Sequence, residues 1–131
     1  MTAPNIIGVV TITGKSVTGA LGTSTASLLQ NSASSNKVFK INTILVSNVD
    51  GTNSATVDLF VDGLGSGASG VTTTGADATV YLAKTIAVPA DTSLVLLDTP
   101  IYLMEGDVLK GGASANSDLD LFVSYEVLDD A

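Results

Sequence analysis

The sequence predicts an all-β sandwich, and three observations carry this prediction. Val, Ile, Thr and Leu alternate with polar residues along most of the chain, which is the period of a strand with one buried face. Clusters of Gly, Asn, Asp and Ser separate these segments at intervals of roughly 8–12 residues, as in β-sandwiches and barrels. No long segment repeats its apolar residues with the period of a helix, and Glu occurs only at Glu105 and Glu126.

We expect about seven strands from residue 37 onward. They cover Lys37–Val49, Ala55–Asp62, Ala78–Val88, Ser93–Leu97, Ile101–Met104, a short segment at Val108 and Leu109, and Leu119–Val127. The first has apolar residues on both faces, as in a central strand. The Asp50-Gly51 pair after it favours a hairpin with the second strand. The last strand has the most regular alternation in the chain, which predicts one fully buried face.

The sequence of this region also predicts where one strand ends, which of its residues face the core, and the positions of two loops. The strand that begins at Ala78 should end at Pro89, because proline cannot donate to a β-ladder. Glycine-rich composition predicts loops at Gly63–Asp77, which should be flexible, and at Gly111–Asn116. The predicted inner face of the strand before Pro89 consists of Val80, Leu82, Ile86 and Val88.

The first 36 residues differ from the rest because Thr, Ser, Ala and Gly dominate them. Asn5–Thr13 can form one strand, and Ser24–Gln30 can form an edge strand against Lys37–Val49, since Thr favours strands. We therefore divide the chain into residues 1–36, an N-terminal extended arm or outlying strand pair, and residues 37–131, the sandwich domain.

Composition argues against most catalytic and nucleic-acid functions. The 131 residues include no Arg, His, Cys or Trp, which removes the Ser-His-Asp triad, the His or thiolate metal site and the bidentate phosphate fork. A net charge of −8 repels nucleic acids. No segment resembles a signal peptide or a membrane helix. We expect a non-enzymatic protein without cofactor, metal or small-molecule substrate, and without nucleic-acid or membrane partners.

Two pairs of aspartates and three tyrosines are candidate site residues. Asp58 with Asp62, and Asp118 with Asp120, share one side of a strand. Paired carboxylates can act as acid and base or bind calcium. The interpretation preferred here is a solvated strand face, and calcium remains the alternative. The tyrosines are Tyr81, Tyr102 and Tyr125, which favour core and rim packing over a carbohydrate platform.

Three blocks of sequence, spread over nearly the whole chain, carry a family resemblance. They contain the motifs NIIG and TGK (5–8, 13–15), NKVFKIN and VSNVDGT (36–42, 46–52), and AKTIAVPAD, IYLMEGD, ASANSDL and SYE (83–91, 101–107, 113–119, 124–126). This pattern resembles small virion structural proteins of tailed bacteriophages, especially phages of cyanobacteria and marine bacteria. The resemblance implies a structural role in the virion, and its motifs are turns and strands without catalytic residues.

The turn from Leu103 to Asp107 also resembles turns in jelly-roll modules of the C1q and tumour-necrosis-factor group. Its Gly permits a tight reversal, and its Asp can accept hydrogen bonds from nearby backbone amides. The sandwich is therefore expected to be jelly-roll-like.

Taken together, these features predict a capsid decoration (cement) protein, expected to be a homotrimer that binds the major capsid protein or another virion protein. The apolar N-terminal segment is expected to dock on such a neighbour by strand addition, although it could equally be the first core strand. The candidate partner-binding residues are Ile6, Ile7, Val9 and Val10. Alternative functions are a neck, tail or fibre component, and a host-surface or carbohydrate-binding module.

Overall fold

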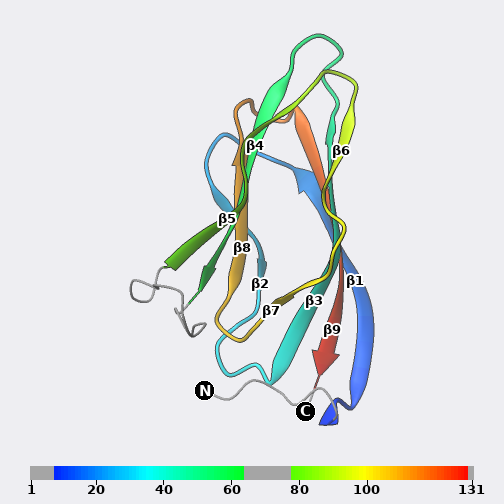
Figure 1. The fold of residues 1–131 in the computed structure, drawn as a ribbon, viewed down its shortest axis with the longest axis vertical. Coiled ribbons are helices and arrows are strands. Elements are labelled where there is room, and N and C mark those ends of the chain that lie inside the picture. The colour runs from blue at the N-terminus through cyan, green and yellow to red at the C-terminus, as the bar shows by residue number, and fades with distance from the viewer. Residues whose placement is uncertain (1–7, 64–77, 130–131) are drawn as a thin grey trace.

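The computed structural model describes residues 8–63 and 78–129, which form two antiparallel β-sheets packed face to face (Figure 1). The strands are β1 (Thr11–Ala20), β2 (Ala26–Gln30), β3 (Lys37–Asn48), β4 (Ala55–Gly63), β5 (Ala78–Val88), β6 (Ser93–Leu97), β7 (Ile101–Leu103), β8 (Val108–Ala113) and β9 (Leu119–Asp129). The predicted all-β sandwich is confirmed. Within the described residues, no helix is long and apolar enough to cross a membrane.

Strand pairing follows the jelly-roll order. Sheet A has the order β1-β9-β3-β6, with β7 also paired to β3, and sheet B has the order β2-β8-β4-β5. The strands β6 and β7 pair with successive parts of β3 and so occupy one strand position. The pairs β1–β9, β2–β8, β3–β6/β7 and β4–β5 are then nested, as in a long hairpin rolled across two sheets.

Two predicted pairings are wrong. The expected hairpin of Lys37–Val49 with Ala55–Asp62 does not form, because β3 lies in sheet A and β4 in sheet B. The turn between them crosses from one layer to the other. The segment Ser24–Gln30, expected beside β3, supplies β2, which pairs with β8 at the edge of sheet B. The first 36 residues thus contribute one edge strand to each sheet.

The glycine-rich segment at Gly111 is also not the predicted loop. Gly111 and Gly112 lie within β8, between β2 and β4. A Cβ on Gly111 would lie 2.6 Å from the Asp58 carbonyl oxygen, so glycine permits a close approach of two strands here. The other predicted loop, Gly63–Asp77, lies outside the described residues apart from Gly63.

The inner face of β5 differs from the alternation in the sequence. Ala83 and Val88 are buried, whereas Val80 and Ile86 are exposed. The cause is a double register shift between β4 and β5, together with the left-handed conformation of Thr85 (φ 52°). The Asp58 carboxylate accepts a hydrogen bond from the Thr85 amide at 2.6 Å, which stabilises this irregular strand.

The core lies between the inner faces of the two sheets. In β9 the alternation is as predicted, since Leu119, Leu121, Val123, Tyr125 and Val127 are all buried. In β3 a register shift between Ile41 and Thr43 changes the parity of the strand. Fully buried side chains of both sheets meet here, including Ile41, Ile44, Val46, Val57, Leu59, Leu103, Leu109 and Val123.

Two buried asparagines join the sheets at opposite ends of the sandwich. Asn31, directly after β2 of sheet B, donates its side-chain amide to the carbonyls of Lys37 (2.8 Å) and Leu103 (3.0 Å) in sheet A. Asn48, the last residue of β3, donates to the Val88 carbonyl in sheet B at 2.8 Å. Both side chains therefore satisfy backbone groups where the strands of one layer end against the other.

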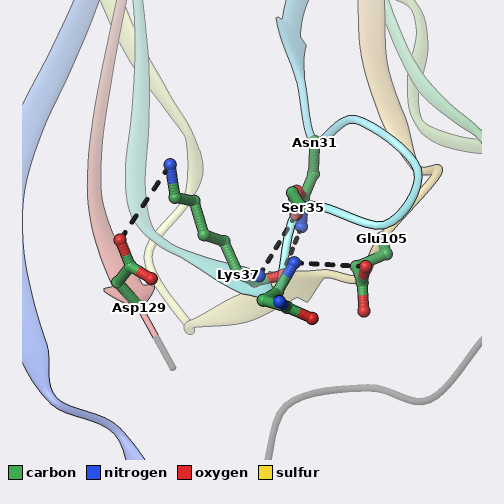
Figure 2. Close-up of polar contacts among 6 residues, drawn as sticks. Asn31, Ser35, Lys37, Glu105 and Asp129 are labelled. Carbon is green, nitrogen blue, oxygen red and sulfur yellow. Dashed lines mark hydrogen bonds and ion pairs between the residues drawn. The ribbon is translucent and has the colours of Figure 1, made fainter. Parts of the chain in front are cut away.

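The loop after Asn31 closes around a second buried polar group (Figure 2). The Ser35 hydroxyl donates to the Asn31 side-chain oxygen at 2.6 Å, and the Asn36 amide donates to the Glu105 carboxylate at 3.2 Å. Ser34 and Asn36 adopt left-handed conformations, which bend this loop back onto the turn before β8. The other carboxylate oxygen of Glu105, Oε1, is buried without a hydrogen-bond partner.

Candidate functional site

The four sheet edges differ in how they are protected against pairing with another chain. The edge strand β5 carries register shifts, and β2 is only five residues long and also irregular. The opposite edge of sheet A is divided between β6 and β7, of five and three residues. In contrast, β1 has ten residues, no proline, one charged side chain (Lys15) and no register shift against β9. Long regular edges of this kind are templates for strand addition.

The β1 strand lies at the outer edge of sheet A (Figure 1), and both of its faces are exposed. Nine of its ten residues are exposed, and only Val17 is half-buried. Ile12 is 65% exposed, and Val10, just before the strand, is 67% exposed. The edge strand of sheet B that faces β1 is half as long, so much of β1 has no opposing layer.

The backbone of β1 offers unpaired groups along its whole outer edge. The Leu21 amide donates to the Leu119 carbonyl at 2.8 Å, which continues the β1–β9 register. Because hydrogen-bonded pairs alternate in an antiparallel ladder, the odd-numbered residues of β1 bond to β9. The even-numbered residues direct their amides and carbonyls away from β9. They are Ile12, Gly14, Ser16, Thr18 and Ala20, and no strand among the described residues pairs with them.

An apolar groove lies between the second half of β1 and β2. It has a volume of about 200 Å³, and its lining includes Val17, Leu21, Leu28 and Leu121. A Cβ added to Gly19, which also lines the groove, would meet no atom within 4 Å. A strand added to β1 would place every second side chain beside this groove, which is how strand addition acquires specificity.

The outer face of sheet A next to β1 includes exposed apolar side chains. By register it presents Phe122, Leu45 and Val95 in one row across β9, β3 and β6. Phe122 is 43% and Val95 57% exposed, and a shallow hollow of about 370 Å³ lies beside Phe122 and Leu45. Asp120 also lines this hollow, and Glu126 lies on the same face of β9, so the face combines apolar side chains with a small number of charges and is suited to contact with another protein surface.

Of the predicted partner-binding residues, Val9 and Val10 lie at the start of this edge. Val10 is exposed, and its amide donates to the Asp129 carbonyl of β9 at 2.8 Å, so it extends the pairing of β1. Val9 is half-buried, and Ile6 and Ile7 lie outside the described residues. The sequence prediction missed the strand Thr11–Ala20 itself, although its alternating Thr, Ile and Val are β-formers that signal it.

Structural contacts hold the first pair of aspartates, Asp58 and Asp62. Asp58 accepts from the Thr85 amide, whereas Asp62 forms an ion pair with Lys110 at 2.8 Å and accepts from the Thr79 hydroxyl at 2.5 Å. Asp118 lies in the loop before β9, and Asp120 lies on the outer face of that strand. Over residues 8–63 and 78–129, no group of three or more carboxylates is placed to hold a metal ion.

The three tyrosines do not form one platform. Tyr125 is buried and packs against Phe39, with ring centroids 5.5 Å apart. Tyr81 packs against Phe60 in sheet B in a tilted arrangement, with ring centroids 5.1 Å apart, and its ring centroid lies 4.5 Å from the Lys84 ammonium. Tyr102 is exposed on sheet A. Tyr125 and Tyr81 therefore belong to two separate packing clusters, and Tyr102 belongs to neither.

The ion pair of Asp62 predicts an acid-sensitive contribution to stability. The hydrogen bond from Lys110, followed by that from Thr79, lowers the pKa of Asp62 below its ordinary value of 3.8. The lowered pKa stabilises the fold above pH 3.8, and this contribution disappears as pH falls through the lower folded-state value. We expect the free energy of unfolding of wild type to lose its advantage over that of Asp62→Asn as the pH falls below the ordinary value of 3.8, measured by urea denaturation at each pH.

The comparison with wild type at each pH is essential because other carboxylates titrate nearby. Hydrogen bonds from the Thr52 amide and the Asn53 side chain lower the pKa of Asp50, whereas burial raises that of Asp107. When Lys110 is replaced by alanine, the ion pair is absent. The difference in free energy of unfolding between the protein with Asp62 and its Asp62→Asn variant should then depend less on pH. A difference that stays constant across the acid range would contradict the assignment.

Comparison with protein-family models finds none that matches this chain, and comparison with curated proteins finds no match either.

Proposed function

We propose that this chain is a non-enzymatic structural protein of a tailed-phage virion, namely a capsid decoration protein that binds and stabilises the head. The resemblance of its turn and strand motifs to small phage virion proteins supports a location in the virion. The observation that carries the assembly role is the open edge of β1, which has ten residues in regular register, nine of them exposed. An edge of this kind favours pairing with a neighbouring chain.

Two further features fit a module that works by contact with other proteins. The outer face of sheet A combines exposed apolar side chains with few charges. The contacts of the described carboxylates are structural: Asp50 stabilises a turn, Asp58 an irregular strand, and Asp62 an ion pair with Lys110. On this proposal the partners are the major capsid protein and further copies of the chain.

Deletion of residues 1–12 is expected to abolish binding to expanded heads while leaving a folded β-protein. Val10 and Ile12 are two of the most exposed apolar residues, so their loss removes contact surface but little core. Eight residues of β1 remain to pair with β9. Co-sedimentation with expanded heads measures binding, and circular dichroism measures the fold. A Thr52→Ala variant, changed in an exposed loop, is the control, and full binding by the truncated protein would contradict the role of this segment.

Copy number separates decoration from other virion roles. Quantitative mass spectrometry of heads saturated with the protein should give hundreds of copies per head, since a decoration protein follows the repeated symmetry of the shell. About a dozen copies would assign the chain to a neck or tail ring, whose symmetry is a single closed ring. Failure to bind any virion assembly would overturn the proposal.

A further inference from the structure

We propose that the β1 edge binds the β1 edge of a second copy of this chain, antiparallel and about a two-fold axis at Ser16. The inference rests on the proposed function, in which this edge serves assembly, and names the partner of that site. It commits to an isologous dimer, in which the same surface is used by both subunits.

The symmetry of the edge itself carries the argument. The residues that direct backbone groups outward run from Ile12 to Ala20 in steps of two, and Ser16 is the central one. A two-fold axis there pairs Ser16 with its own copy, Gly14 with Thr18, and Ile12 with Ala20. All five residues on each strand then find partners, and about ten backbone hydrogen bonds form. Any other antiparallel register leaves outward groups unpaired at both ends.

The charge pattern also permits this register. Lys15 is the one charged residue of β1, and the axis at Ser16 places it opposite Val17 of the other copy instead of opposite its own copy. Like charges directly opposite each other are destabilising in a ladder. β1 itself contains no acidic residue, and the acidic residues next to it by register, Asp120 and Glu126, lie on β9, one strand in from the edge.

Dimerisation in this way joins the two copies of sheet A into one continuous sheet. The outer faces of both copies then lie on the same side, and the row of Phe122, Leu45 and Val95 is doubled. A capsid-facing surface of twice the area follows without any change in the fold of either subunit.

The first test is the solution mass of the full chain by size exclusion with light scattering. We expect twice the chain mass of 13.1 kDa, independent of EDTA. A monomer at high protein concentration, or a trimer, would overturn the proposal, because an isologous edge pairs only two copies. Thr18→Pro should give a monomer, because the Thr18 amide faces outward and its loss spares the ladder with β9. A Thr18→Pro protein that remains folded and dimeric would also overturn it.

Disulfide trapping tests the register directly, since the chain contains no cysteine. In Ser16→Cys, the two Cα atoms would be about 5.5 Å apart, within the range of a disulfide. Ser124→Cys is the matched control, because Ser124 pairs with Ser16 in the β1–β9 ladder. Its two copies would lie three strand spacings apart, about 14 Å, too far for a bond. Oxidation should give covalent dimer for Ser16→Cys, at least tenfold more than for the control, and equal yields would overturn the register.

The outcomes distinguish this inference from the proposed function. If the monomeric Thr18→Pro variant still decorates heads, the function stands on another surface. If the wild-type dimer forms but binds no virion assembly, the pairing stands and the proposed function fails.

Discussion

Replacement of Asn31 by alanine should lower the free energy of unfolding by about 3 kcal/mol or more, because each buried polar group left unpaired costs about 1–3 kcal/mol. Asn31 is completely buried, and its amide satisfies the carbonyls of Lys37 and Leu103. The alanine variant leaves both carbonyls and the Ser35 hydroxyl without these partners. Urea denaturation followed by circular dichroism gives the free energy, since the chain has no tryptophan for fluorescence.

Two further variants separate the hydrogen bonds from the volume of the Asn31 side chain. Asn31→Asp keeps the shape but turns the two amide donors into an acceptor, so it should destabilise at neutral pH at least as much as alanine does. Asn53→Ala removes an amide from an exposed turn, where its bond to Asp50 is 3.2 Å long. This control should cost less than about 1 kcal/mol. An Asn31→Ala effect as small as that of the control would show that the inter-sheet contact contributes little.

Replacement of Gly111 by alanine is the second large expected effect, a loss of about 2–3 kcal/mol, typical of overpacking in a close-packed region. The added methyl group would lie 2.6 Å from the Asp58 carbonyl oxygen and 3.2 Å from one methyl group each of Leu28 and Leu59. The backbone of β4 cannot move away without disturbing its ladder with β8 and β5. The same denaturation experiment measures the loss.

Gly14→Ala is the matched control for the Gly111 substitution. Gly14 also lies in a strand, but a Cβ there meets no atom within 4 Å. Alanine restricts the unfolded chain more than glycine does, so Gly14→Ala should be neutral or stabilise by up to about 1 kcal/mol. Equal effects at the two positions would refute the role assigned to the close approach of β8 and β4.

Local patterns were sufficient for the regular strands and failed at the irregular ones. The uninterrupted alternation of Leu119 to Val127 predicts the buried face of β9 correctly, since nothing changes its parity. In β3, the register shift after Ile41 points both Ile41 and Ile44 at the core, although they have opposite parity. In β5, the shift near Thr85 exposes Ile86, which the alternation placed inside.

The open edge could be predicted only in part. The apolar residues Val9 and Val10, just before β1, predict a contact surface from the sequence alone. That β1 is a sheet edge depends on β9, which follows it by about a hundred residues and fills its other side. Edge status is a property of neighbours, so no local pattern reports it.

The amino-acid sequence by itself determined the class of fold, the positions of most strands and the absence of the side chains on which most catalytic sites depend. These follow from side-chain period, turn chemistry and composition, which act over a few residues. Only the tertiary structure decided which sheet each strand joins, why Gly111 must be glycine, why Asn31 is buried and which edge stays open. Each of these depends on chain segments far apart in sequence, whose approach is set by packing two layers around one core.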